Sequence, residues 1–240
     1  QTSEGVFIVW DENNDIFGQH INFSGDLLGD ESGIAICSDS AEQANPSIDY
    51  LGSLNQIMAC WDDRRNSDRD IYCASITLSN NAVNEIPITE NKSQAQVNPY
   101  VKSTLTDSYL VAWEESALYS FSDVFTGDPV YYYDISMQEI KSDQVVYSQD
   151  VTVCNAFHDQ RSPRIDILTE SPDISYLIYW EDMRSSGKED LTNLFSQQLK
   201  IEDCNGSLGG SQGFDTGACD CNGSVLDQCG VCGGSNSTCS

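Results

Sequence analysis

Four short apolar runs, each ending in tryptophan and then an acidic residue, recur along this chain. They occupy residues 6–11, 57–62, 110–114 and 177–181 and carry Trp10, Trp61, Trp113 and Trp180. Continuous apolar runs of this length, bounded by polar turns, are typical of strands that are buried on both faces. A second extended segment follows each run, at 15–21, 70–76, 130–140 and 193–199. We therefore predict four β-hairpins.

Two further extended segments complete the repeating unit. A proline-containing segment precedes the last three tryptophan runs, at 45–49, 98–101 and 162–166. Proline suits the first residue of a strand, because no ladder N–H is lost there. A fourth candidate strand lies before each of these segments, at 33–37, 85–89 and 151–154. The unit is thus four antiparallel strands.

Tandem four-stranded units without a helical period are typical of a β-propeller. We expect an all-β fold, a small propeller of about four blades at residues 1–203, followed by a loop-rich cysteine module at 204–240. A β-sandwich of similar strands is the alternative, but the regular recurrence of the whole unit favours blades.

The first unit begins at its tryptophan strand and has no proline strand before it. Residues 205–218 could return to close the ring, or an upstream segment or neighbouring copy could complete the blade by strand addition. An uncovered strand edge promotes uncontrolled association. The pattern therefore suggests head-to-tail assembly with copies of the chain or neighbouring repeats of the same polypeptide.

Two of the units resemble a Trp-acid-Asp-x-Arg…Asp-Ile-Tyr blade repeat of secreted and cell-surface β-propellers. The matching residues are Trp61-Asp62-Asp63-Arg64 with Asp70-Ile71-Tyr72, and Trp180-Glu181-Asp182 with Arg184. The third unit departs from the repeat, since Glu115 is followed by Ser116 and no arginine, and the first unit is shortened. The resemblance implies an extracellular propeller.

The ten cysteines suggest disulfide bonds. Cys60 and Cys73 flank one hairpin and are predicted to pair across it. Cys37 and Cys154 either pair elsewhere, for example with Cys204, or are small apolar thiols. The last five cysteines crowd a segment with almost nothing apolar to bury, so disulfides are expected to hold it. They are Cys219, Cys221, Cys229, Cys232 and Cys239.

The tail is similar to the Asp-x-Cys-Gly-Val-Cys-Gly-Gly repeat of extracellular proteins and to the end of the cysteine-rich region of thrombospondin-motif metalloproteinases. The matching residues run from Cys219 to Gly223 and from Asp227 to Cys239, with the repeat itself at 227–234. The resemblance implies a disulfide-bonded connector without catalytic residues, since the chain has no His-Glu-x-x-His motif. The Cys229-x-x-Cys232 spacing would also suit zinc, but both histidines lie far away in sequence.

Five glycosylation sequons, together with the cysteines, favour a secreted glycoprotein. They begin at Asn22, Asn91, Asn205, Asn222 and Asn236. No apolar run approaches the ~20 residues that cross a bilayer, so we expect no membrane insertion. Residue 1 is Gln without a leader, which suggests a processed or excerpted chain.

The net charge of −27, from 11 basic and 38 acidic residues, excludes a nucleic-acid binder. Calcium is the one cofactor that the acids suggest. Asp11-x-Asn13-x-Asp15 has the alternating spacing of a calcium loop, although Ile16 stands where the EF-hand type requires Gly. A denser set is interleaved with arginines and could equally be an ion-paired turn. It comprises Asp62, Asp63, Asp68 and Asp70.

The residues do not suggest an enzyme, because two histidines accompany no nucleophile motif. The insertion at 114–129 carries Tyr119, Phe121 and Phe125, which would contact a protein or sugar, or cover their own blade's edge. We predict an extracellular structural or adhesive module, a subunit or repeat of a fibre or surface coat. The alternative is a glycan-binding propeller, calcium-dependent or not. A glycoside hydrolase, which needs only two carboxylates, is third.

Overall fold

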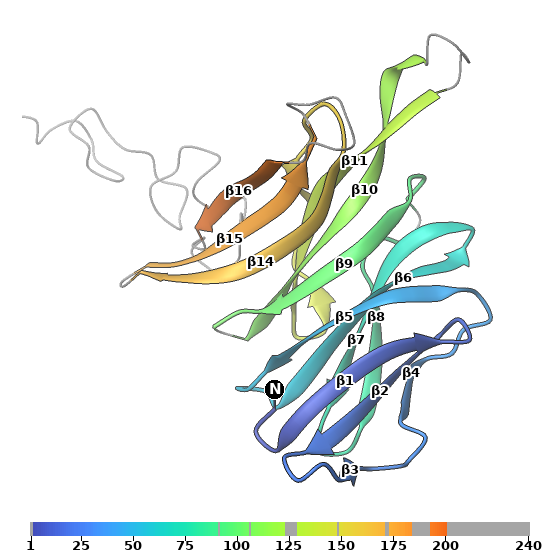
Figure 1. Ribbon diagram of the computed structural model, residues 1–240, viewed down its shortest axis with the longest axis vertical. Coiled ribbons are helices and arrows are strands. Elements are labelled where there is room, and N and C mark those ends of the chain that lie inside the picture. The colour runs from blue at the N-terminus through green and yellow to red at the C-terminus, as the bar shows by residue number, and fades with distance from the viewer. Residues whose placement is uncertain are drawn as a thin grey trace, which may run out of the picture. The chain divides into compact units, whose positions relative to one another are not determined.

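The computed structural model describes residues 2–90, 92–105, 107–122, 129–147, 149–170, 173–183 and 193–200. In these ranges it contains strands and no helix, and hence no helix able to cross a membrane. The strands form four antiparallel sheets that follow one another along the chain (Figure 1). The predicted all-β class is confirmed, and none of the four described sheets closes on itself.

Sheet A contains β1 (Gly5–Glu12), β2 (Asp15–Asn22), β3 (Leu27–Leu28) and β4 (Ile34–Cys37). β1 is at one edge, and both β3 and β4 pair with β2. Sheet B has the order β5 (Gln43–Leu51), β6 (Gln56–Asn66), β7 (Asp68–Thr77) and β8 (Ala82–Pro87).

Sheet C contains β9 (Gln96–Ser103), β10 (Ser108–Ser122) and β11 (Pro129–Lys141), with β12 (Gln144–Val145) and β13 (Val151–Cys154) on β11. Sheet D has the order β14 (Gln160–Glu170), β15 (Asp173–Asp182) and β16 (Asn193–Lys200). The four tryptophan runs lie on β1, β6, β10 and β15, so the predicted hairpins are confirmed.

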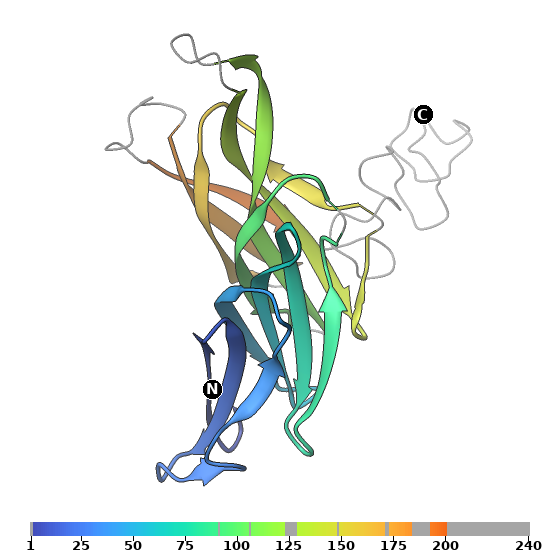
Figure 2. The same ribbon diagram turned by 90° about the vertical axis from the view of Figure 1, so that its right-hand side faces the viewer.

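The chain divides into two compact units, residues 1–165 with 179–196, and residues 166–178 with 197–240. Sheets A, B and C belong to the first unit, and both views place sheet B between the other two (Figures 1 and 2).

The prolines do not stand at the first residue of their strands, contrary to the prediction. β5, β9 and β14 begin three residues earlier, at Gln43, Gln96 and Gln160. The β5–β6 and β9–β10 registers shift at their prolines, as in a β-bulge. A bulge leaves one residue outside the ladder, so it accommodates the missing proline N–H inside a strand.

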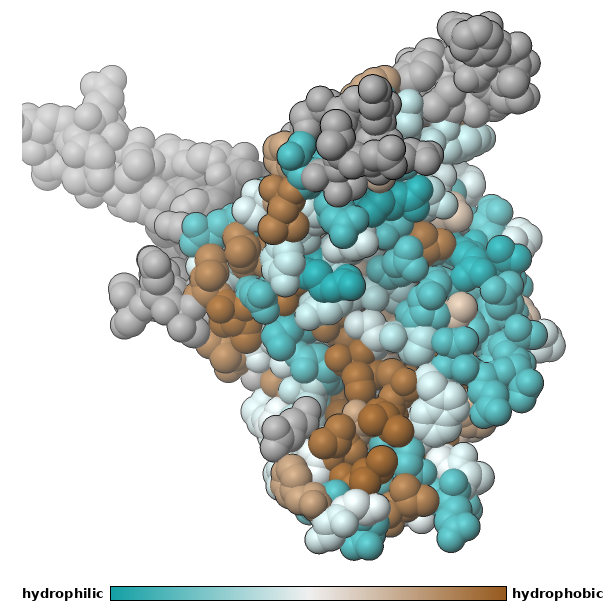
Figure 3. Space-filling view, viewed as in Figure 1, coloured by the Kyte–Doolittle hydropathy of each residue, from teal (hydrophilic) through white to brown (hydrophobic). Residues whose placement is uncertain are grey.

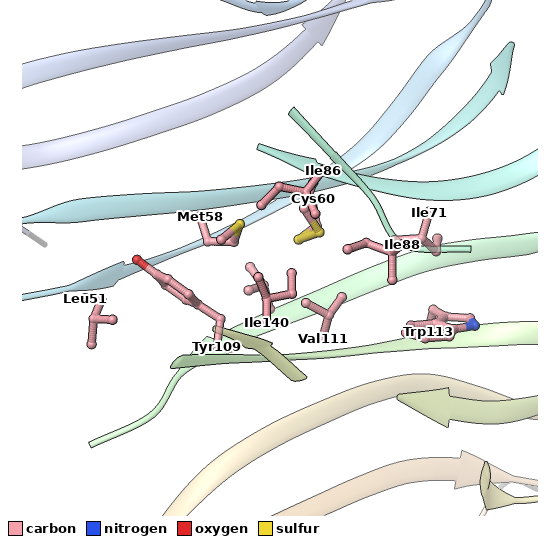
Figure 4. Packing of buried hydrophobic residues seen from close by; sticks show 12 residues of the cluster. Leu51, Met58, Cys60, Ile71, Ile86, Ile88, Tyr109, Val111, Trp113 and Ile140 are labelled. Atoms are coloured by element: carbon pink, nitrogen blue, oxygen red, sulfur yellow. A yellow bond between two sulfur atoms is a disulfide. The ribbon is translucent and has the colours of Figure 1, made fainter. Parts of the chain in front are cut away.

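Apolar side chains fill the two spaces between these three sheets. Phe7, Ile16, Ile36 and Trp61 belong to the cluster between sheets A and B. The cluster between sheets B and C is built mainly from β6, β7 and β10 (Figure 4). Successive residues of β6 alternate between the two clusters, because strand side chains alternate between faces. This explains why the tryptophan run of β6 is apolar without interruption.

The predicted disulfide between Cys60 and Cys73 is present. The two residues lie directly opposite each other on β6 and β7. Cys37, by contrast, is a buried thiol, and burial raises its pKa to about 11. Its sulfur also accepts a hydrogen bond of 3.2 Å from Arg65 Nη2, so this free thiol is not purely the apolar side chain that was one of its two expected roles.

Candidate functional site

One face of sheet A is apolar and uncovered. Val6 and Ile8 of β1 are 45% and 43% exposed, and Trp10 on the same face is half-buried. Phe7 and Val9 point the other way, into the cluster shared with sheet B. Brown, apolar side chains gather where β1 runs across the surface in Figure 3. We call Val6, Ile8 and Trp10 the open face.

The same positions are buried in every other sheet. Counting back from the tryptophan by two and four residues gives Ala59 and Ile57 on β6, which are 0% and 1% exposed. Their neighbours are side chains of sheet A. The corresponding residues of β10 and β15 are also buried. They are Tyr109, Val111 and Trp113 on β10, and Tyr176, Ile178 and Trp180 on β15. In sheets B, C and D, this apolar face is therefore buried.

The edge of sheet A is uncovered too. β6, β10 and β15 each pair with a proline-bulge strand, whereas β1 has no strand on that side among the described residues. The unit predicted to lack this strand does lack it in the described chain. β1 therefore carries unpaired backbone N–H and C=O groups along one side.

The three proline-bulge strands share a motif that the sequence reasoning missed, Gln-x-Asn/Ser-Pro. The glutamines Gln43, Gln96 and Gln160 are buried, and their amide groups donate to carbonyls just upstream. The next-but-one residue has a left-handed backbone in each strand. These residues are Asn45 (φ 55°), Asn98 (φ 53°) and Ser162 (φ 54°). Asn tolerates this conformation better than most residues. The signal was available, since each glutamine precedes its proline by three residues.

The acid after Trp61 and the acid after Trp113 each bind two of these bulges. Asp62 Oδ2 accepts the Asn45 side-chain amide at 2.7 Å and the Asn98 backbone N–H at 3.3 Å. Glu114 Oε1 repeats the arrangement, with the Asn98 side chain at 3.1 Å and the Ser162 N–H at 2.9 Å. One carboxylate thus joins its own bulge to that of the following sheet.

Asp11 occupies the equivalent place on β1 and is exposed. In the described chain its carboxylate has no such asparagine partner, since the strand that would bring one is missing. Among the described residues, sheet A therefore has no sheet over Val6 and Ile8, no strand beside β1 and no asparagine partner for Asp11.

A cavity of about 390 Å³ lies where the three bulges converge. Its walls are polar groups and two proline rings. They come from Asn45, Pro46, Asn98, Pro99, Glu114, Ser162 and Arg164.

The dense acidic set does not converge. Asp62 and Asp63 are adjacent on β6 and point to opposite faces. Asp62 pairs with Arg69, and Asp63 accepts a hydrogen bond of 2.7 Å from Arg65. These contacts match the ion-paired turn, which was the alternative to calcium. Asp68 is exposed, whereas Asp70 is buried and accepts a hydrogen bond from the Asn66 side chain.

The shortened first unit is a two-residue hairpin rather than a calcium loop. Glu12 pairs with Asp15, and Asn13 and Asn14 between them have positive φ, as a type I′ turn requires. Asp11 pairs with Ile16, so Asp11 and Asp15 lie on opposite faces. The structure contains no group of three acidic, His or Cys residues able to hold a metal within the described ranges.

Several predicted residues lie outside the described residues. They are Cys204, Cys219, Cys221, Cys229, Cys232, Cys239, Asn91, Asn205, Asn222, Asn236 and Phe125, together with the side chains of Tyr119 and Phe121 on β10. Asn22 ends β2, and its side chain binds Asp26 and the Ser24 N–H.

No protein-family model and no curated protein matches this chain. Among solved structures, the catalytic domain of the Coprinopsis cinerea GH62 alpha-L-arabinofuranosidase is similar at 10% identity and a TM-score of 0.40. The alignment covers 87% of this chain and 68% of that one. A likeness at this level carries no argument about activity.

Proposed function

We propose that this chain is a structural, adhesive module of an extracellular assembly, in which a like unit covers the open face and edge of sheet A. The four sheets would be blades of a β-propeller, and the cysteine tail would be a disulfide-bonded connector. The observation that carries the proposal is the contrast between Ile8, 43% exposed, and Ala59, its buried counterpart on β6.

The chain itself indicates what would cover sheet A. Sheet B buries its tryptophan face against sheet A, and sheet C buries its own against sheet B. A sheet of the same kind therefore has the shape that fits the open face. Burying a Val or Ile side chain contributes about 1.5–3 kcal/mol relative to full exposure, so covering Val6 and Ile8 would favour association.

The edge of β1 calls for a strand of the proline-bulge type. β6 and β10 each accept one, and the acid after their tryptophan accepts its asparagine amide. Asp11 would accept the same group from an incoming strand. Main-chain hydrogen bonds would supply affinity, and this side-chain bond would set the register.

The test is sedimentation velocity and electron microscopy of the chain purified without reductant. We expect concentration-dependent association, and filaments or closed rings in the images. Ile8→Glu should leave a monomer, because an apolar contact would then bury an unpaired carboxylate. The matched control is Leu54→Glu, a 48% exposed residue in the turn between β5 and β6, which should associate like the native chain.

A peptide of residues 41–51 probes the edge alone. It carries the β5 motif and should bind to the chain and inhibit its association, whereas a peptide with the same residues scrambled should not. A native chain that is monomeric at every concentration, or an Ile8→Glu variant that associates like Leu54→Glu, would refute the proposal.

A further inference from the structure

Arg164 stands apart from the other basic residues. Each of the other Lys and Arg residues whose side chains are described has a carboxylate within 4.0 Å. Arg164 has no carboxylate within 4.0 Å among the described residues, and its Nη1 donates to the Pro163 carbonyl at 2.8 Å. In a chain with 38 acids and 11 bases, an unpaired guanidinium is the exception.

The surroundings of Arg164 are those of a binding site. Its guanidinium lies 5.0 Å from the centre of the Tyr100 ring and lines the cavity at the three bulges. Arg164 is exposed, and the Pro163 carbonyl and the Tyr100 ring together orient its guanidinium, which lowers the entropy lost when a ligand binds. The cavity, at about 390 Å³, is within the range of small-molecule sites.

The other walls offer acceptors and apolar faces. Asn45 and Asn98 donate through their amide nitrogens to Asp62 and Glu114, so their amide oxygens are left for a ligand. The half-buried Pro46 ring supplies apolar surface, and the buried Pro99 ring also lines the cavity.

Glu114 also lines the cavity but presents little free charge. Its Oε2 accepts from Arg161 at 2.9 Å, and its Oε1 accepts from Asn98 and Ser162.

We propose that this cavity binds a carboxylate-bearing sugar, a hexuronate, whose carboxylate pairs with Arg164. The guanidinium fork matches a carboxylate in two hydrogen bonds. The sugar hydroxyls would donate to the Asn45 and Asn98 amide oxygens, and its C–H faces would lie on the proline rings.

The net charge of −27 does not prevent this binding. Charges more than about 8 Å apart are largely screened at physiological ionic strength, so the groups lining the cavity decide. The inference is independent of assembly at sheet A, because none of the residues involved lies on that sheet.

The test compares sugars that differ only in the carboxylate. The full chain is titrated by calorimetry and saturation-transfer NMR with glucuronate and galacturonate, and with glucose and galactose. We expect saturable binding of at least one uronate and much weaker binding of its parent hexose. Arg164→Gln should weaken uronate binding about tenfold or more, since a hydrogen bond to a charged group is lost.

Two controls separate the site from folding and from general charge. Arg64→Gln removes an exposed arginine that pairs with Glu42 and should bind uronate like the native chain. Circular dichroism checks that Arg164→Gln is folded. Equal binding of uronate and hexose, unchanged binding in Arg164→Gln, equal competition by acetate, or no saturable binding would each overturn the inference.

Discussion

Sheets A and B carry the same tryptophan hairpin in different surroundings. The two tryptophans sit at equivalent register positions, Trp10 opposite Phe17 and Trp61 opposite Tyr72. Trp61 is fully buried, whereas Trp10 is half-buried and stacks on Phe17 with ring centres 6.0 Å apart. Sheet B has a neighbour on each face and sheet A has one. The strand pattern thus fixes the local structure, and the neighbouring sheets decide how much of it is buried.

The cross-strand pair next to the tryptophan shows a second difference. In sheet B it is the Cys60–Cys73 disulfide, and in sheet A it is Val9 opposite Gly18. A Cβ on Gly18 would lie 2.5 Å from the Phe7 ring, so the phenylalanine occupies the space of a side chain there. At this position, the strands of sheet B are joined by a disulfide bond, whereas in sheet A the Phe7 ring packs over Gly18.

Truncating the two tryptophans should give the largest contrast. Trp61→Ala removes a fully buried indole and its hydrogen bond to Asp63, and should lower the free energy of unfolding by about 3–5 kcal/mol. Trp10→Ala in the isolated chain should cost about 1 kcal/mol, because much of that ring already contacts water. Urea unfolding of the monomer measures both. Equal losses would mean that the open face is covered even in the isolated chain.

Much of the fold could be predicted from the sequence because it is local. Period, length and turn residues fix the hairpins at Trp10, Trp61, Trp113 and Trp180, and the missing first strand follows from comparing the units. The Cys60–Cys73 bond followed from strand pairing alone. Each of these inferences uses residues that lie close together in the chain.

The hydrogen bonds and ion pairs at the proline bulges are harder to predict, because they join residues that lie far apart in the sequence. The Asn98 N–H binds Asp62 from 36 positions away, and Arg161 binds Glu114 from 47. No periodicity reveals such contacts. Sequence proximity groups the aspartates together, whereas alternation along β6 puts Asp62 and Asp63 on opposite faces. Arg164 stood out only once its neighbours were known.

Exchanging Asp and Glu two residues after tryptophan should give a smaller effect that sharpens the comparison. Where this residue is Asp, the indole N–H donates to it at 3.0 Å, as in Trp61–Asp63 and Trp180–Asp182. Where it is Glu, the distance is 3.5 Å in sheet A, and the buried Trp113 N–H of sheet C has no acceptor in the described part of the chain. Glu115 instead accepts hydrogen bonds from Lys92 and Ser136.

Glu115→Asp should therefore stabilise the chain by up to about 1 kcal/mol, because an orphaned buried donor costs ~1–3 kcal/mol and the partly exposed Lys92 pair contributes less. Asp63→Glu is the matched reverse exchange and should destabilise sheet B by about 2 kcal/mol. Urea unfolding gives the free energies, and the indole N–H chemical shift of Trp113 reports the new bond. If both variants raised the free energy of unfolding, or both lowered it, the preference for Asp two residues after the tryptophan would be contradicted.

The smallest effect concerns the two adjacent acids of β6, which should respond to pH with opposite signs. Burial raises the pKa of Asp62 more than its bonds to Asn45 and Arg69 lower it. Burial also raises the pKa of Asp63, but hydrogen bonds from Arg65 and Trp61 outweigh it and leave that pKa below its ordinary value. Folding thus favours the protonated form of Asp62 and the ionised form of Asp63.

Stability contributed by Asp62 is therefore present at low pH and lost as the pH rises from 3.8 through its raised pKa. Stability contributed by Asp63 is present above 3.8 and lost as the pH falls through its lowered pKa. Relative to the native chain, Asp62→Asn should become less destabilising as the pH rises, and Asp63→Asn should become more destabilising. Urea midpoints between pH 3 and 7 would show the opposite slopes, with Asp11→Asn on the open sheet as the control. Parallel slopes would mean that folding shifts the pKa values of both carboxyl groups in the same direction, and the opposite effects of burial on Asp62 and of ion pairing on Asp63 would be refuted.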